Sequence, residues 1–409
     1  MSTGASGATP PVSYLNTYTG STSIGSGVTV VGDISTSVGV TVTGAYDING
    51  TALGLIDPSG SGTIQSSTTN AALTVTSTNG STFSGTLAST INGLTKSGAG
   101  TLILSGTNSM TSDTTTTISA GTLQIGAGST TGSLGSNTVS NSGALVFNRS
   151  DSYTYAGVVS GTGSLTHSGS GALTLSSATY IGTTTIASGA TLIGNIATSV
   201  GVAVTGTYDL NGTACTLVDP SSSGTIQSSG SNVALTITST NGSTFSGTLA
   251  SSINGLTKNG SGSLTLGGAN THAGATTVSS GKLTLTNHTA ASSGIIALGS
   301  GATLEGNFAS NAAIANAITI TDSATLLATQ SFTTTGGVSG SANLIISGAG
   351  VVTFGTPNTY TGTTTLASGA TLSISSADHL PSTTALIMEN NTTLRITAGG
   401  FTLPCGFVF

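Results

Sequence analysis

The amino-acid sequence predicts an all-β protein built as a single elongated β-solenoid. Three observations predict it: a short cassette recurs along the chain, its runs alternate apolar and polar residues, and Gly or Asn-Gly separates the runs. Alternation with a period of two is typical of strands. A solenoid needs short strands and tight corners in every repeat, because each coil buries its inner face only against its neighbours. A row of antiparallel sandwiches would want longer strands and larger core residues than 4% aromatics supply.

The cassette is clearest at Gly255–Leu285, which reads GLTKNGSGSLTLGGANTHAGATTVSSGKLTL. It recurs at Leu94–Ile125, Leu165–Leu192 and Ile345–Leu372. A longer repeat lies over it, because residues 36–96 realign on residues 198–258 at an offset of 162, with 49 of 61 positions identical. Three conservative differences between the copies predict buried, volume-limited sites: Ile48 to Leu210, Ile56 to Val218 and Val75 to Ile237.

These repeats predict the following organisation. Residues 1–15 form a flexible leader, because Pro10-Pro11 follows small polar residues. Residues 16–385 form the β-helix, in which 16–177 and 178–285 are related by the 162-residue duplication and 286–345 form irregular coils. Residues 386–409 form a C-terminal cap or a truncated end. Because the first cassette begins halfway through, we expect a partial sequence.

Strands and corners are predicted from local pattern. Runs rich in β-branched residues predict strands, among them Val40–Val42, Leu73–Val75, Leu102–Leu104 and Leu264–Leu266. Each Asn-Gly pair predicts a corner where φ is positive. The pairs are Asn49-Gly50, Asn79-Gly80, Asn92-Gly93, Asn211-Gly212, Asn241-Gly242 and Asn254-Gly255.

Composition excludes several classes of function. Charged residues are 4% of the chain, the formal net charge is −6, and the five basic residues are scattered. Binding nucleic acid needs clustered Lys or Arg, so no nucleic-acid partner is expected. No apolar stretch is long enough for a membrane span. A hydrophobic share of 36%, placed at alternating positions, argues against disorder.

The only recurrent acidic pair is Asp47 with Asp57, repeated as Asp209 with Asp219. One interpretation is a calcium site or a catalytic dyad. The favoured interpretation is a turn, because Asp-x-Asn-Gly and Asp-Pro are both turn chemistry.

The remaining reactive side chains predict no site. The four histidines, His167, His272, His288 and His379, lack metal-ligand spacing. His272 takes the cassette position of Tyr18 and Tyr180, and we expect a surface-strand variant there. Cys215 stands where the other copy has Leu53, which predicts a buried thiol, and a disulfide to Cys405 is left open. We therefore expect no catalytic, cofactor-binding or metal-binding residues and no enzymatic activity.

Two threonine triplets, Thr183–Thr185 and Thr363–Thr365, suggest exposed rows of hydroxyl and methyl groups. Flat threonine arrays are typical of ice-binding solenoids, which leaves ice binding as an alternative function.

The cassette resembles the passenger-associated transport repeat of bacterial autotransporter (type V secretion) proteins, over roughly residues 16–372. The intervening Thr205–Thr213 (TGTYDLNGT) and Ser223–Gly230 (SGTIQSSG) are similar to those passengers as well. The resemblance implies a right-handed parallel β-helix, displayed on the outer membrane or secreted. It implies a non-enzymatic adhesin, stalk or self-associating fibre, whose partner is a receptor or glycan on a host or neighbouring cell, or another copy. A β-helical polysaccharide hydrolase or lyase is the other alternative.

Overall fold

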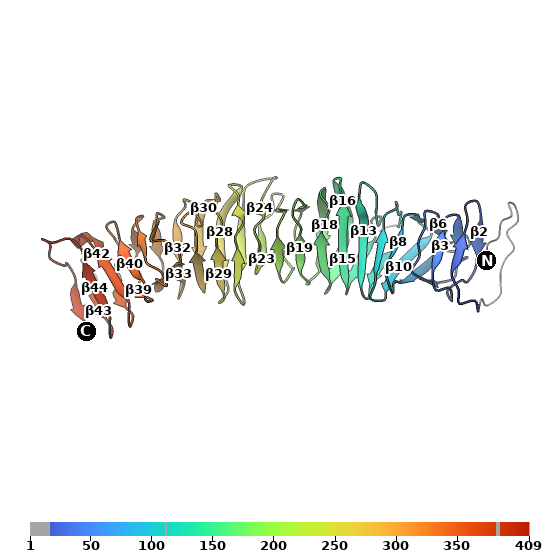
Figure 1. Ribbon diagram of the computed structural model, residues 1–409. Helices are drawn as coiled ribbons and strands as arrows, with labels where there is room; N and C mark the ends of the chain where they lie inside the picture. The colour runs from blue at the N-terminus through green and yellow to red at the C-terminus, as the bar shows by residue number, and fades with distance from the viewer. Residues whose placement is uncertain (1–16, 111–112, 382–384, 409) are drawn as a thin grey trace. The chain divides into compact units, whose positions relative to one another are not determined.

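The computed structural model describes residues 17–110, 113–381 and 385–408, and within them the protein is all-β (Figure 1). Parallel strands stack into a β-solenoid, which confirms the predicted fold class. The predicted leader, 1–15, lies outside the described residues. The chain divides into two compact units, residues 1–200 and 201–409, and each is described by itself.

Unit 1 contains parallel sheets whose strands follow one another coil by coil. The longest run is β5 (Leu53–Ile56), β7 (Ala71–Thr76), β10 (Ile91–Ser97), β12 (Thr115–Ile118), β14 (Thr138–Asn141), β16 (Tyr153–Gly161), β18 (Ala172–Ala178) and β20 (Thr191–Ile193). A second run is β8 (Ser81–Phe83), β11 (Thr101–Leu104), β13 (Thr122–Ser129), β15 (Ala144–Arg149), β17 (Ser164–His167) and β19 (Thr184–Ile186). The first coils add β2 (Thr29–Val31), β4 (Ala45–Asp47), β6 (Thr63–Gln65) and β9 (Thr86–Leu87), and the pair β1 (Thr22–Ile24) and β3 (Val40–Val42).

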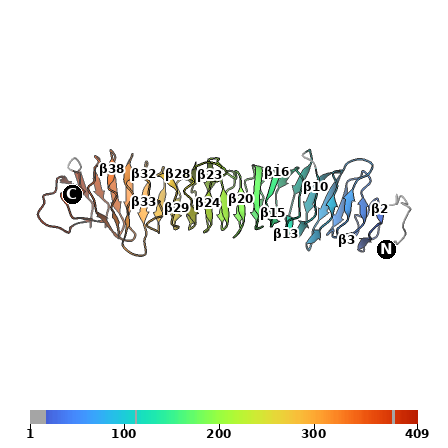
Figure 2. The same ribbon diagram turned by 90° about the horizontal axis from the view of Figure 1, so that it is seen from above.

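Unit 2 repeats this construction. One sheet, called the threonine sheet below, is β23 (Cys215–Val218), β25 (Val233–Thr238), β28 (Ile253–Asn259), β30 (Ala273–Val278), β32 (Ile296–Leu298), β35 (Ile318–Ile320) and β38 (Val338–Gly340) (Figure 2). A second is β26 (Ser243–Phe245), β29 (Ser263–Leu266), β31 (Lys282–Leu285), β33 (Thr303–Gly306), β36 (Ala324–Leu327), β39 (Leu344–Ser347), β41 (Thr364–Leu366), β43 (Ala385–Met388) and β45 (Gly406–Val408). A third is β34 (Ala312–Ile314), β37 (Phe332–Thr334), β40 (Val351–Phe354), β42 (Thr371–Ile374) and β44 (Thr393–Ile396). The remaining elements are β21 (Val202–Val204), β22 (Thr207–Asp209), β24 (Thr225–Gln227), β27 (Thr248–Leu249) and the 3₁₀ turn η1 (Ala377–His379).

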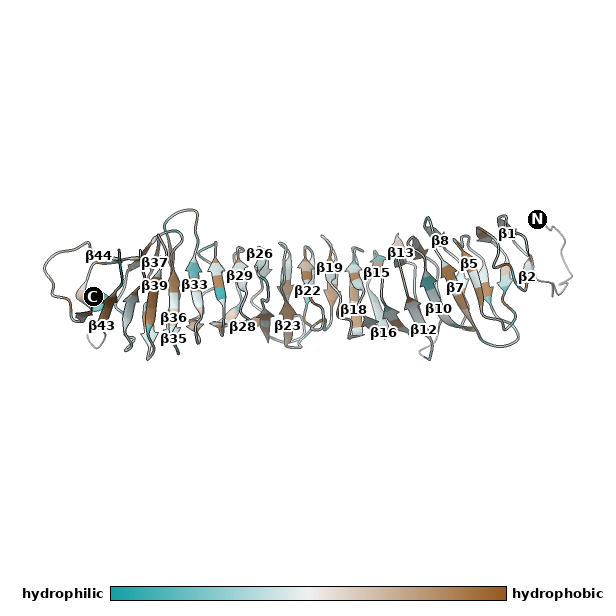
Figure 3. Ribbon diagram, turned by 90° about the horizontal axis from the view of Figure 1, so that it is seen from below, coloured by the Kyte–Doolittle hydropathy of each residue, from teal (hydrophilic) through white to brown (hydrophobic). Residues whose placement is uncertain are grey.

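The core consists of columns of like side chains. In unit 1, Leu102 pairs with Leu123, which pairs with Leu145, which pairs with Leu165, and all four are buried. Burying one such side chain contributes about 1.5–3 kcal/mol relative to leaving it exposed. Figure 3 shows the hydrophobic colour on strands such as β7, β23 and β39. The period-two pattern therefore encodes which residue of each strand faces the core.

The conservative differences between the two copies are mostly buried, as predicted. Ile48 and Leu210 are buried, as are Val75 and Ile237. The third pair, Ile56 and Val218, is half-buried, because each is the last residue of its strand at a corner.

The predicted Asn-Gly corners are present at most pairs and absent at two. Gly50 and Gly80 have φ of 76° and 97°. By contrast, the pairs ending in Gly93 and Gly255 lie inside β10 and β28, at shifts of strand register. Gly at these two positions fits a β-bulge in a strand, so the predicted corner is wrong at both. The predicted positive φ nevertheless holds at Gly255, where φ is 110°.

Residues 286–345 continue the coils, with β32 to β38 pairing in parallel and a further sheet beginning at β34. In the described part of 386–409, β44 pairs with β42 and β45 pairs with β43. None of the described residues forms a helix long and apolar enough to cross a membrane.

Candidate functional site

The predicted acidic pair forms turns. Asp47 accepts hydrogen bonds at Oδ1 from the backbone N–H of Asn49 (2.8 Å) and of Ser67 on the next coil (3.0 Å). Asn49 has φ of 52°, which confirms the predicted turn. Burial raises the pKa of the Asp47 carboxyl, but hydrogen bonds from Ser67 and Asn49 outweigh it and leave that pKa below its usual value. Asp209 repeats this arrangement with Asn211 and Ser229.

The second acid of each copy is held elsewhere. Asp57 accepts hydrogen bonds from the backbone N–H (2.9 Å) and Oγ1 (2.5 Å) of Thr78. Asp219 is held in the same way by Thr240. Across the described residues, no three His, Cys, Asp or Glu side chains are grouped to hold a metal ion. Each acid thus makes a hydrogen-bonded corner with its own partners, Asn49 and Ser67 for Asp47 and Thr78 for Asp57.

The surface-strand prediction for His272 is wrong. His272 is 1% exposed, and its Nε2 lies 2.9 Å from Oγ1 of Thr276. Tyr180 makes the corresponding contact with Thr184, so the cassette alignment is right although the predicted exposure is not. The reason is that the Thr four residues later also points inward and offers a hydroxyl inside the coil. Tyr18, at the same cassette position, is 47% exposed and donates to the Ser21 carbonyl.

The other histidines are not brought together. His167 is buried, with Nε2 2.9 Å from the Gly171 carbonyl oxygen. Burial lowers the pKa of His167. His379 is buried in η1, and His288 is exposed.

The cysteine prediction is confirmed. Cys215 and Cys405 are both buried, and neither is in a disulfide. The Cys215 sulfur lies 3.5 Å from the hydroxyl oxygen of Tyr208, inside the coil.

The threonine triplets are not fully exposed rows. Thr184 and Thr364 point inward, where each pairs with a buried tyrosine hydroxyl, Tyr180 and Tyr360 respectively. Only alternate members of a triplet can face solvent, because strand side chains alternate between the two faces.

Sequence reasoning missed two buried lysines. Lys96 is 0% exposed, and its Nζ donates to the carbonyl oxygens of Ser97 (2.8 Å), Gly98 (2.9 Å) and Ala120 (3.0 Å). Burial lowers the pKa of Lys96, and the negative charge of Asp57 opposes that shift. Lys258, in the other copy, makes the same three kinds of contact. The signal was available, since both lysines stand at an alternating position that is otherwise apolar.

A second missed feature is the cassette asparagine, which joins three coils. Asn270 accepts from the backbone N–H of Leu249 on the preceding coil (2.8 Å) and donates to the carbonyl of Ala290 on the following one (2.6 Å). Asn108 does the same between Leu87 and Ser133. These asparagines are buried, so their hydrogen bonds fix one coil on the next.

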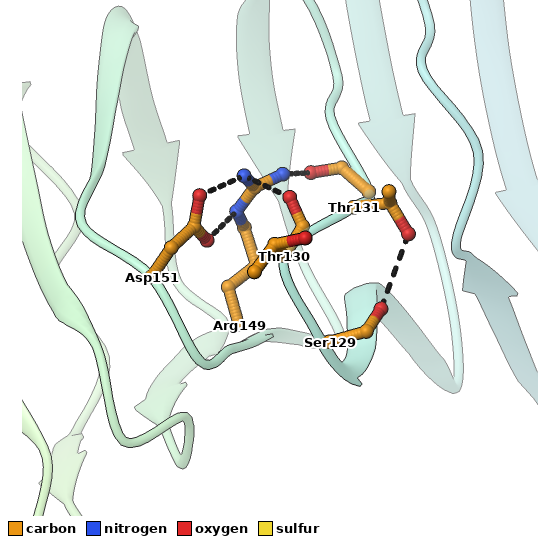
Figure 4. Close-up of polar contacts among 6 residues, drawn as sticks. Ser129, Thr130, Thr131, Arg149 and Asp151 are labelled. Atoms are coloured by element: carbon orange, nitrogen blue, oxygen red, sulfur yellow. Dashed lines mark hydrogen bonds and ion pairs between the residues drawn. The ribbon is translucent and has the colours of Figure 1, made fainter.

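Arg149 organises a loop in unit 1 (Figure 4). Its guanidinium donates to the carbonyl oxygens of Thr130 (2.6 Å) and Gly132, and it pairs with Asp151 through Nε (3.0 Å) and Nη2 (2.8 Å). It also lies 4.6 Å from the centre of the Tyr153 ring. Five N–H donors in one plane explain why Arg can hold a carboxylate and two carbonyls at once.

A second ion pair lies in unit 2. Glu305 is buried and accepts from Nζ of Lys282 (2.6 Å), Oγ1 of Thr284 (2.8 Å) and Oγ1 of Thr329 (2.7 Å). Burial raises the pKa of Glu305, but the hydrogen bonds from Lys282 and the two threonines outweigh it and bring the pKa below its usual value.

The threonine sheet carries a regular outward feature. One position of each strand faces outward in exact parallel register, half-buried or exposed, and none of these residues is charged. The outer row consists of Thr216, Thr236, Thr257, Thr277, Ala297, Thr319 and Ser339.

These features define a β-solenoid repeat protein whose coils are joined by buried polar side chains. Four stretches, residues 94–125, 165–193, 256–285 and 344–374, match the family described as passenger-associated-transport-repeat. The chain therefore carries four such repeats and matches an autotransporter passenger built with them. Comparisons with curated proteins and with solved structures found no match.

Proposed function

We propose that this chain is a non-enzymatic passenger, exported and displayed on the cell surface or released. It acts as an adhesin, a stalk or a self-associating fibre. The family of its repeats and its solenoid fold support the passenger role. The buried lysines and asparagines support a mechanical role, because they join coil to coil.

The observation that carries the proposal is the outer row of the threonine sheet. Neighbouring positions in the row are separated by the strand spacing of about 4.8 Å, and every position except Ala297 carries a hydroxyl. The outer row holds no charge, so another such surface can approach it without like-charge repulsion. Many weak hydrogen bonds along the row would then hold a second copy, or a glycan on another cell.

The alternative, a polysaccharide hydrolase, would need two carboxylates facing one bond. The recurrent carboxylates Asp47, Asp57, Asp209 and Asp219 are engaged by backbone N–H groups of the chain itself. This engagement favours the structural role.

A pair of charge insertions tests self-association. The variant Thr236→Lys/Thr277→Lys places like charges on the outer row, and the matched control Thr265→Lys/Thr325→Lys places them on half-buried outward positions of β29 and β36. Sedimentation velocity should show concentration-dependent association of the wild type and of the control, and its loss in the outer-row variant. A wild type that stays monomeric at high concentration refutes self-association.

Cell-adhesion assays with the same three proteins test the adhesin role. Binding to cells or to a glycan array should fall in the outer-row variant and persist in the control. Equal binding by both variants would place adhesion on another surface. Release of oligosaccharides from a polysaccharide panel would overturn the non-enzymatic part.

A further inference from the structure

Two peptide bonds combine backbone strain with a reactive sequence. Asp57 and Asp219 have φ of 44° and 42°, and each precedes a proline, Pro58 and Pro220. A non-glycine residue at positive φ is uncommon, and the residue before proline is normally driven to extended backbone. Strain of this kind costs about 1–3 kcal/mol and persists only where its surroundings enforce it. Both copies of the duplication preserve it.

The surroundings of Asp57 enforce it from two coils. Its backbone N–H donates to the carbonyl of Thr76 on the following coil (3.1 Å). Two residues on, Ser59 donates to Val40 (2.8 Å) and accepts from Val42 (2.8 Å) on the preceding coil. Backbone hydrogen bonds therefore fix the chain on both sides of the Asp57–Pro58 peptide bond.

The Asp57 carboxylate is held as well, because Thr78 donates to both of its oxygens. In the second copy, Asp219 is held by Thr240 with the same pair of donors. Asp57 and Asp219 are half-buried, so water reaches both corners.

We propose that Asp57–Pro58 and Asp219–Pro220 are latent self-cleavage sites, which acid opens and which Thr78 and Thr240 restrain. The inference is independent of the proposed function. One side-chain oxygen of Asp57 attacks the backbone carbonyl carbon of the same residue and forms a cyclic anhydride. The bond to the Pro58 nitrogen breaks, and the carboxyl proton goes to that nitrogen, which leaves as a secondary amine. Water then opens the anhydride to two carboxyl groups, so that one water is consumed in total.

Acid is required because the reacting carboxyl must supply that proton. The buried amine of Lys96 interacts electrostatically with Asp57, and Lys258 has the same relation to Asp219. Neither lysine donates one of the hydrogen bonds that hold the carboxylates. Those hydrogen bonds come from Thr78 and Thr240.

The experiment uses the full chain, folded, at about pH 3, with circular dichroism to confirm the β-structure. Denaturing gel electrophoresis and N-terminal sequencing should identify new chains that begin at Pro58 and Pro220. The two bonds should be cut at similar rates, because the two corners have the same contacts.

In the variant Thr78→Val, cleavage at Asp57–Pro58 can be compared with cleavage at Asp219–Pro220 in the same protein. The substitution removes the hydroxyl donor at Asp57 and leaves Asp219 unchanged, so the ratio of the first cut to the second should rise by about tenfold, the value of one hydrogen bond to a charged group. Thr240→Val should shift the ratio the opposite way, and Thr78→Ser, which keeps the hydroxyl, should leave it near one. Asp57→Asn should abolish the first cut, because the variant has no carboxyl group there to supply the proton. Asn tolerates the same backbone conformation, so the corner itself is kept.

Two results overturn the proposal. One is that the folded wild type and both valine variants stay uncut at both bonds while a urea-denatured chain at the same pH is cut. The other is a ratio that stays near one in both valine variants. If Thr78→Val unfolds, the ratio in Thr240→Val decides by itself.

Discussion

The Nε2 atom of His272 lies 2.9 Å from Oγ1 of Thr276, in the place where Tyr360 sets its phenol oxygen against Thr364. The imidazole of His272 thus contacts the corresponding threonine hydroxyl with one of its two nitrogens. Its other nitrogen, Nδ1, is buried and has no hydrogen-bond partner among the described residues. Burial lowers the pKa of His272 to about 4, from an ordinary value of 6.5.

His272 therefore makes stability depend on pH. Between pH 6.5 and 4 the unfolded chain binds a proton at His272 that the folded chain does not, so this contribution is complete above 6.5 and is lost as the pH falls toward 4. His272→Tyr removes that loss. Between pH 7 and 4 the free energy of unfolding of the wild type should fall by about 2–3 kcal/mol more than that of the variant.

Urea unfolding at both pH values measures this difference. His167, whose pKa is also lowered, is present in both proteins and cancels. The exposed His288 changed to Asn serves as the control and should behave as the wild type. Parallel pH profiles of the wild type and His272→Tyr would contradict the assignment.

Glycines at one corner of the coil are required by close backbone approach. A Cβ atom on Gly106 would lie 1.9 Å from the carbonyl oxygen of Gly85, and one on Gly85 would lie 1.9 Å from that of Gly62. Gly106→Ala should lower the free energy of unfolding by about 3 kcal/mol, because a backbone atom must move. Gly39→Ala, where nothing lies within 4 Å, should leave it unchanged or raise it by up to about 1 kcal/mol. Equal effects of the two substitutions in chemical denaturation would contradict this explanation.

Much of the fold could be predicted because its signals are local. Period-two runs such as Leu102–Leu104 determine which side chains are buried, and the cassette spacing determines that coils stack. The role of Gly106 could not be predicted in this way, since the atom that excludes a side chain there belongs to Gly85, on another coil.

The inner polar contacts were harder to predict for the same reason. The sequence shows that Lys96 stands at a position that is otherwise apolar, but it does not show which groups the lysine contacts. The carbonyl of Ala120 that it contacts lies 24 residues away, on another coil. The turn at Asp47 was predictable because one of its hydrogen bonds is local, to Asn49.

Arg149 should control the order of the loop that contains Thr130 and Gly132. Arg149→Ala removes the donors to both carbonyls and the pairing with Asp151, so amide hydrogen exchange in the loop should become faster by about tenfold or more. Asp151→Asn should have a smaller effect, because Arg149 keeps its two carbonyls and the Tyr153 ring. Arg395→Ala, an exposed arginine in β44, is the control for loss of a positive charge. Exchange in the loop that is unchanged by Arg149→Ala would show that the loop is ordered by its own backbone.

The asparagine that joins three coils should be the most sensitive polar position of the cassette. Asn270→Ala leaves the buried N–H of Leu249 and the carbonyl of Ala290 without this partner, which should lower the free energy of unfolding by about 2–4 kcal/mol. Asn270→Asp can still accept from Leu249 but places a carboxylate against the Ala290 carbonyl, so it should destabilise more at pH 7 than at pH 3. Asn254→Ala, an exposed asparagine in β28, should cost less than about 0.5 kcal/mol. Denaturation of the three variants at both pH values separates these effects, and a pH-independent Asn270→Asp would mean that the side chain leaves the coil when it is charged.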